Sequence, residues 1–273
     1  MIFRYLSNIA RRTFDAPDET VNHGVIGYLG LTETTDISAP DLAPGFILDN
    51  KTAAPPWHIV DHDLRTMTIP NWPISLWKVH ALKPIRPQGH RGNYTRCSAI
   101  KVLESLPSFM VFGETDTGVV DIIEFAQKMT LKQAQSLSKL RGRDAPATNS
   151  KVWQRWIKQN GNSRDGYIKD FDNVLSIGRS LGDSPIGSGL LLISRVIFNQ
   201  AGKVDAEKAY AYEDDGTPFL ADPWDKACST LKDAALSFGA SELCDKADIA
   251  EMRRPLRQVV PGLVKMIEDK VQK

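Results

Sequence analysis

Cysteine is scarce in this sequence. Its 273 residues include three cysteines, Cys97, Cys228 and Cys244. Because their number is odd, their spacing is wide and no CxxC pair occurs, neither a disulfide framework nor a thiolate zinc site is expected. This cysteine usage fits a reducing compartment, so we expect a soluble, cytoplasmic protein.

Long apolar runs are missing as well. The most apolar stretch, residues 189–198, contains Arg195. It has about half of the roughly 20 residues that a membrane-spanning helix needs. We therefore expect no membrane span and no membrane partner.

The sequence also lacks the common catalytic and cofactor motifs. It has no GxxxxGK[ST] phosphate loop, no GxGxxG after a strand, no GxSxG elbow and no set of kinase motifs. RNP, KH and zinc-finger signatures are absent too. We expect no cofactor, and the absence of these motifs leaves open whether the protein is an enzyme.

What the sequence does contain is ordinary globular composition. Apolar residues make up 42% and charged residues 25%, which predicts a folded chain rather than a disordered or fibrous one. The length suits one large domain or two small ones. We predict one compact domain over residues 1–273, with a β-rich part at about 20–105 and a helical part at about 118–273.

The order of patterns along the chain predicts an α+β fold with strands early and helices late. Strands are predicted at 24–29, 75–82 and 94–103. Helices are predicted at 118–129, 130–140, 149–159, 167–177, 224–238 and 249–271, with Thr130, Asn149 and Asp222 as N-caps. Segments 191–198 and 205–212, followed by an Asp-Asp-Gly turn, predict a hairpin, and Pro255 and Pro261 should break or kink the last helix.

Charge is partitioned along the chain, although the formal net charge is only +1. Residues 17–63 hold eight acids and one cation, and residues 64–103 hold seven cations and no acid. Residues 125–164 hold nine cations and one acid, whereas residues 203–248 hold eleven acids and five cations. The opposed blocks could neutralise each other within the fold, or the two basic blocks could form one face that attracts a polyanion.

The best local candidate for such a face is the segment KVWQRWIKQNG at 151–161. On a helix, its tryptophans share one arc with Val152 and Ile157, and its cations line the other, where they could contact phosphates. Flanking loops and the earlier loop KPIRPQGHRGNY contribute further cations, and aromatic residues between cations suit single strands. The predicted nucleic-acid-binding residues are Lys151, Arg155, Lys158, Arg141, Arg143, Arg86 and Arg91. A solvated basic helix is the alternative.

Two clusters are candidates for metal-dependent chemistry. The first is WHIVDHD, with His58, Asp61 and His62, but it has no HExxH general base and no assignable third ligand. The second is FGETDTG, where Glu114 and Asp116 could hold Mg²⁺. Acids at a helix start are also favoured as caps. Neither cluster predicts a metal site.

The leading hypothesis is therefore a binding protein with a basic surface for nucleic acid or another polyanion. The alternative is a metal-dependent hydrolase or nuclease that uses one of the two acidic clusters. A third hypothesis is an interaction subunit whose charged segments dock on a protein partner or on a second copy of the chain.

Overall fold

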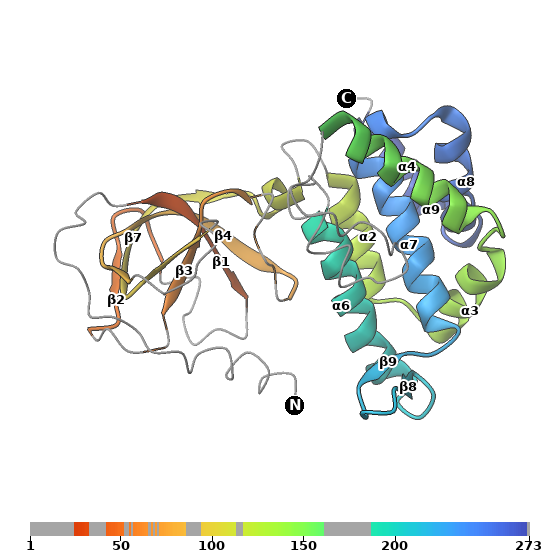
Figure 1. The fold of residues 1–273 in the computed structure, drawn as a ribbon, viewed down its shortest axis with the longest axis horizontal. Helices are drawn as coiled ribbons and strands as arrows, with labels where there is room; N and C mark the ends of the chain where they lie inside the picture. Colours follow the sequence, from red (N-terminus) through yellow and green to blue (C-terminus); the bar gives the residue numbers. More distant parts are fainter. Residues whose placement is uncertain are drawn as a thin grey trace. The chain divides into compact units, whose positions relative to one another are not determined.

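The computed structural model describes residues 25–32, 42–51, 55, 57–64, 67, 69, 71–85, 94–112, 117–160 and 187–271. Strands dominate the first part of the described chain and helices the second (Figure 1). The predicted α+β class, with a β-rich N-terminal half and a mainly helical C-terminal half, is confirmed. The helix predicted at 167–177 lies outside the described residues.

The chain divides into two compact units. The sheet unit contains Met1–Leu64 and Ile74–Pro107, and the helical unit contains Arg65–Pro73 and Ser108–Lys273. The chain thus leaves the sheet unit at residue 65, returns at residue 74 and leaves again at residue 108. The single domain over residues 1–273 stays a prediction.

The sheet unit holds one antiparallel sheet with the strand order β2-β7-β4-β1-β3-β6-β5. Its strands are β1 (Ile26–Thr32), β2 (Ile47–Asp49), β3 (His58–Asp61), β4 (Ile74–Ala81), β5 (Pro84–Ile85), β6 (Tyr94–Cys97) and β7 (Ala99–Leu106). The three predicted strands correspond to β1, β4 and the pair β6 and β7. Alternation of apolar and polar residues in these segments is the pattern of a strand with one buried face.

The sheet curls because β6 and β7 are two halves of one bent strand, separated only by Ser98. β6 pairs with β3 and β5, whereas β7 pairs with β4 and β2. At the bend, the Ser98 N–H donates to the Lys83 carbonyl at 3.0 Å, and the Ser98 carbonyl accepts from Asn50 N at 2.9 Å. The sheet therefore has an inner face, which holds the core, and an outer face.

The inner face carries the apolar half of each alternating strand. Trp77 lies opposite Leu29 on β1, and Val79 lies opposite Val102 on β7. The core of this unit comprises Leu29, Leu31, Leu42, Val60, Trp77, Val79, Ala81, Cys97, Ile100 and Val102. Burial of this apolar surface is the main term that stabilises the sheet unit.

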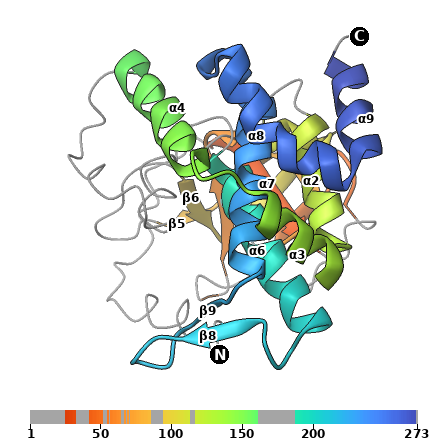
Figure 2. The same ribbon diagram turned by 90° about the vertical axis from the view of Figure 1, so that its right-hand side faces the viewer.

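The helical unit packs its helices around α7 (Trp224–Gly239), which lies in their midst in Figure 2. Ten of the sixteen residues of α7 are buried, and it packs against α2, α3, α6 and α8. The other elements are η4 (Ser108–Phe112), α2 (Thr117–Gln127), α3 (Leu131–Leu140), α4 (Ala145–Asn160), α6 (Gly187–Val204), η5 (Ser241–Leu243), α8 (Lys246–Val259) and α9 (Pro261–Val271).

The helix ends show where local patterns suffice. Thr130 caps α3 as predicted, in a capping box with Gln133. Asn149 is no cap, because α4 begins four residues earlier. Asp222 is no cap either: Pro223 precedes α7, and the Asp222 carboxylate binds Lys226 one turn later. α9 begins at Pro261, which confirms the predicted break there.

The hairpin prediction was half wrong. Residues 191–198 lie within α6, where apolar residues on one face pack against α2 and α7. The hairpin is formed by β8 (Tyr210–Tyr212) and β9 (Pro218–Leu220) about the predicted Asp-Asp-Gly turn, in which Gly216 has φ +79°. None of the helices in the described part of the chain is both long and apolar enough to cross a membrane.

Candidate functional site

The predicted histidine cluster does not converge in the structure. His58 faces the inner side of the sheet, where burial lowers its pKa and its Nε2 has no hydrogen-bond partner among the described residues. Asp61 faces the outer side, because alternate residues of a strand point to opposite faces. His62 Nε2 lies 2.8 Å from Thr95 Oγ1. Within the described ranges, no three His, Cys, Asp or Glu side chains group as metal ligands.

The second cluster, Glu114 and Asp116, lies outside the described residues, so the alternative hypothesis that it holds a metal is untested. The same holds for Arg86 and Arg91 and for the side chain of Lys158. Arg143 is exposed on the surface of the helical unit. The remaining predicted binding residues, Lys151, Arg155 and Arg141, are all described.

The helix at 151–160 has the predicted two-sided character. Trp153 is 2% exposed and Trp156 is 7% exposed, and their rings meet edge to face with centroids 6.2 Å apart. Lys151 is exposed and Arg155 is half-buried. Periodicity therefore predicted correctly that Val152, Trp153 and Trp156 are buried, but it could not indicate what the cations contact.

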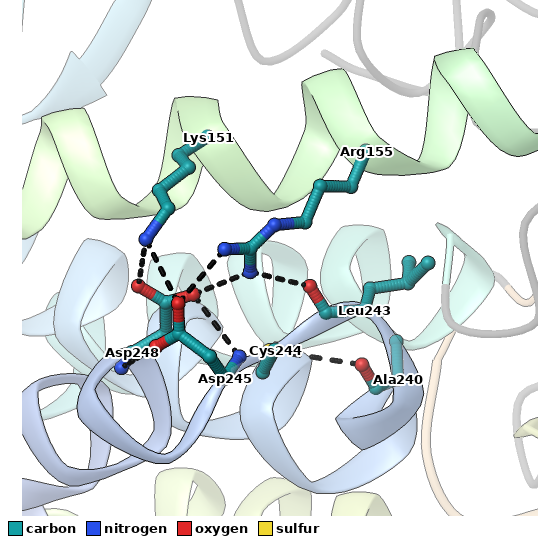
Figure 3. A network of polar contacts seen from close by, with 7 residues as sticks. All are labelled: Lys151, Arg155, Ala240, Leu243, Cys244, Asp245 and Asp248. Carbon is teal, nitrogen blue, oxygen red and sulfur yellow. Dashed lines mark hydrogen bonds and ion pairs between the residues drawn. The ribbon is translucent and has the colours of Figure 1, made fainter.

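Lys151 and Arg155 of α4 both bind the start of α8 (Figure 3). Lys151 Nζ lies 3.0 Å from Asp245 Oδ2 and 3.0 Å from Asp248 Oδ1. Arg155 Nη2 donates to Asp245 at 2.8 Å, and its Nη1 donates to Asp248 and to the Leu243 carbonyl. Two cations and two carboxylates thus form one network between two helices.

The two carboxylates also cap α8. Asp245 Oδ1 accepts from the Asp248 N–H at 2.9 Å, and Asp248 Oδ2 accepts from the Asp245 N–H at 3.1 Å. The Asp248 N–H, then Lys151 and Arg155, hold the pKa of Asp245 well below its ordinary value. Hydrogen bonds that Lys151 and Arg155 donate to the two carboxylates raise the pKa values of both cations.

Arg141 is paired in the same manner, deeper in the unit. Its guanidinium lies 3.3 Å from Asp233 Oδ2, and Asn149 Nδ2 donates to Asp233 Oδ1 at 2.8 Å. Burial raises the pKa of Asp233 to about 6, although both neighbours lower it. These contacts pair the basic block 125–164 with the acidic block 203–248. For these three cations, charge neutralisation within the fold is what the structure shows.

A different surface, the outer face of the sheet, brings together aromatic and charged side chains from several strands. Register places one residue from each of five neighbouring strands in line: Tyr94 pairs with Asp61, Asp61 with Tyr28, Tyr28 with Lys78, and Lys78 with Glu104. We call this line the tyrosine row. Directly paired side chains lie on the same face, about 5 Å apart at Cβ.

A second line runs beside it, two residues along the strands. Ile26 pairs with His80, His80 with Lys101, and Lys101 with Ile47. We call this line the isoleucine row. Its two isoleucines, Ile26 and Ile47, are 57% and 54% exposed. Lys101, which lies between His80 and Ile47, is also exposed. An exposed isoleucine therefore lies at each end of this row, with His80 and Lys101 between them.

Arg96 adds an aromatic stack at the end of the tyrosine row. Its guanidinium carbon lies 5.4 Å from the centroid of the Trp57 ring and 5.6 Å from that of Tyr94. Arg96 Nη2 also donates to the Tyr94 hydroxyl at 3.1 Å. Such contacts orient the ring and the guanidinium together.

Asp61 stands in the middle of these groups without a hydrogen-bond partner for its carboxylate among the residues that the structure describes. Burial raises the pKa of this carboxyl to about 7. The cost of a dry carboxylate without a partner is what shifts the pKa upward. Asp61 is therefore a half-buried carboxyl of the outer face whose charged form is disfavoured by burial.

Sequence reasoning missed this surface because its members come from five separate segments. The signal that could have found it is alternation. In the segment 74–81, Lys78 and His80 fall opposite the buried positions Val79 and Ala81. Which strands lie side by side, and in which register, is not visible in the sequence.

Comparisons with known proteins give no further guide to this surface. No family model, no curated protein and no solved structure matches the chain. The function is therefore inferred from the chemistry of the surfaces that the two units display.

Proposed function

We propose that the protein binds single-stranded nucleic acid on the outer face of its sheet unit. The observation that carries this proposal is the composition of the tyrosine row and its surroundings. Two tyrosines, an Arg96 stacked on Trp57 and the cations Lys78 and Lys101 share one face. Aromatic rings that stack on bases, combined with cations that bind phosphates, are how many proteins hold single strands.

The geometry of a curled sheet favours this ligand. Neighbouring strands are about 4.8 Å apart, and the two rows are about 7 Å apart along each strand. A flexible single strand can follow such a surface, with bases on the rings and the backbone near the lysines. A rigid duplex would need a protruding element that enters a groove.

The sheet is a better candidate than α4. A phosphate that approached Lys151 or Arg155 would compete with two carboxylates already bound at about 3 Å. Lys78 and Lys101 have no ion-pair partner among the described residues. Electrostatic binding requires cations whose counterions are mobile ions rather than fixed carboxylates.

The proposal is tested by fluorescence anisotropy with labelled single-stranded DNA and RNA of mixed sequence, each about 20 nucleotides long, over a range of salt concentrations. Lys78→Glu with Lys101→Glu should weaken binding at least tenfold, since each reversal replaces an attraction by a repulsion. Loss of two phosphate contacts should also reduce the slope of log affinity against log salt by about 1.4.

The matched control changes the same charges elsewhere. Lys132→Glu with Lys139→Glu alters two exposed cations of α3 in the helical unit and should leave the affinity nearly unchanged. Absence of binding by the native protein at 50 mM salt would refute the proposal. Equal losses in both double variants would assign the affinity to overall charge rather than to the sheet.

A specific observation favours a second candidate, a protein interaction subunit. Four of the exposed large apolar side chains belong to the sheet unit, namely Ile26, Phe46, Ile47 and Ile59. Grouped exposed apolar residues are typical of protein interfaces.

If this face binds a second copy, light scattering should give twice the 30.3 kDa chain mass, and Ile26→Asp with Ile47→Asp should restore the monomer. A monomeric native protein would contradict self-association.

A further inference from the structure

The Asp61 position of the tyrosine row is not explained by phosphate binding. Asp61 lies between Tyr94 on β6 and Tyr28 on β1, with Lys78 as the next member. A carboxylate repels phosphates, so a surface that only bound backbone would gain from any neutral residue here. Its presence between two aromatic rings indicates a different partner group.

The surroundings of the Asp61 carboxylate support the same conclusion. Asp61 accepts no hydrogen bond from the described residues, whereas Glu104, three strands away at the end of the row, is exposed to solvent. Lys78 lies beyond Tyr28 rather than beside Asp61 in the register. A half-buried carboxylate gains most from donors that reach it along with a flat apolar group, because water is excluded at the same time.

We propose that Asp61 reads nucleobases: it accepts hydrogen bonds from a base that stacks on Tyr28 or Tyr94 and presents two neighbouring N–H donors, as guanine does. This inference rests on the proposed function and names the group of the ligand that the site selects. Tyr28 and Tyr94 supply the stacking surface, and Asp61 supplies the hydrogen-bonding edge.

The donor patterns of the bases decide the preference. Guanine presents N1–H and N2–H₂ side by side, which match the two oxygens of a carboxylate. Adenine and cytosine each offer an amino group beside a ring nitrogen that is an acceptor, and thymine offers one N–H between two carbonyls. An ionised Asp61 therefore binds guanine with two bonds, adenine or cytosine with one, and is repelled by the carbonyls of thymine.

The ionisation state supports this role. With a pKa of about 7, the carboxyl is charged in about nine molecules of ten at pH 8. Donors that bind the carboxylate would lower this pKa further, since hydrogen bonds to the charged form favour it. Binding of guanine and ionisation of Asp61 therefore support each other.

The test compares two strands that differ by one amino group at each of three bases. At pH 8, affinities are measured for a thymine 15-mer that carries three central guanines and for the same strand with inosine, which lacks N2–H₂. The native protein should prefer guanine about tenfold, the value of one hydrogen bond to a charged group. Asp61→Asn should bring the guanine-to-inosine ratio close to one, while affinity for the thymine strand is retained or rises.

The matched control is Glu104→Gln, which makes the same chemical change at the exposed end of the same row. It should leave the guanine preference intact. Asp61→Ala serves as a second variant, and thermal unfolding verifies that both Asp61 variants fold.

Two failures are distinguishable. Absence of binding to every strand would refute the proposed function itself. Binding without a guanine preference, or a preference that survives in both Asp61 variants, would overturn the role of Asp61 and leave single-strand binding in place. A loss of preference in Glu104→Gln would also overturn it, because the effect would then follow net charge.

Discussion

At the scale of single residues, Gly27 lies where β1 and β3 come closest. A Cβ added there would lie 2.4 Å from the Asp61 carbonyl oxygen and 2.7 Å from Val60 Cγ1. Both neighbours belong to β3, so the strand itself would have to move. Glycine is required here by the close approach of two strands rather than by its backbone angles.

Gly27→Ala should therefore lower the free energy of unfolding by about 1–3 kcal/mol, the usual cost of overpacking. Gly262→Ala is the matched control, because a Cβ at this helical position has nothing within 4 Å. It should stabilise the chain by about 0.4–1 kcal/mol through the unfolded state. Urea unfolding measures both. Equal effects of the two variants would contradict the close approach.

Asp233 gives a residue-scale prediction about pH. Burial raises its folded pKa to about 6 from an ordinary 3.8, so the folded state binds a proton more tightly than the unfolded state. Its contribution to stability is greatest below pH 4 and is lost as the pH rises through 6. The shift corresponds to about 3 kcal/mol.

Asp233→Asn should remove this dependence. The difference in unfolding free energy between the native protein and the variant should fall by about 3 kcal/mol from pH 4 to pH 7. Urea unfolding at four pH values in this range measures it. A difference that is constant with pH would show that Asp233 titrates normally in the fold.

At the scale of elements, the contact between α4 and α8 is polar at its rim. Lys151 and Arg155 bind the two carboxylates that cap the start of α8. Two helices separated by about 90 residues of sequence therefore share one set of hydrogen bonds (Figure 3). Asp248, whose side chain is 6% exposed, depends on these partners most. A buried carboxylate that loses its cation is costly.

Arg155→Ala should accordingly lower the melting temperature by several degrees, and Lys151→Ala by less, since Arg155 also donates to the Leu243 carbonyl. Arg143→Ala, which removes an exposed cation of the same block, is the control and should have little effect. Salt at 1 M should reduce the difference in melting temperature between the native protein and Lys151→Ala, because exposed ion pairs are screened. If calorimetry gives Arg143→Ala and Arg155→Ala the same loss of melting temperature, the stabilising role of the network is contradicted.

At the scale of the whole molecule, the chain visits the helical unit twice. Residues 65–73 belong to this unit, although they separate β3 from β4. The Ile69 carbonyl accepts from Arg195 Nη1 at 2.6 Å, and the Trp72 ring packs on Phe112 with centroids 5.6 Å apart. Met67, Ile69 and Trp72 are all buried.

A fragment of residues 108–273 should therefore unfold at a lower temperature than the helical unit in the full chain, or aggregate. The fragment lacks Trp72, so the helical surface that packs on Trp72 in the full chain becomes exposed to water. A second fragment, in which residues 65–73 are joined to residue 108 by a flexible linker, should recover much of the loss. Thermal unfolding followed by circular dichroism compares them. Equal stability of the two fragments would show that the segment contributes nothing.

The sequence by itself determined the α+β order, the main strands and most helices, because hydrophobic periodicity and caps such as Thr130 are local. It also determined that Trp153 and Trp156 are buried. Only the tertiary structure decided the partners of Lys151, Arg155 and Arg141, since ion pairs join blocks about 90 residues apart. The tyrosine row likewise depends on strand order and register, because Asp61 is paired with Tyr28 and Tyr94, which lie far from it in sequence.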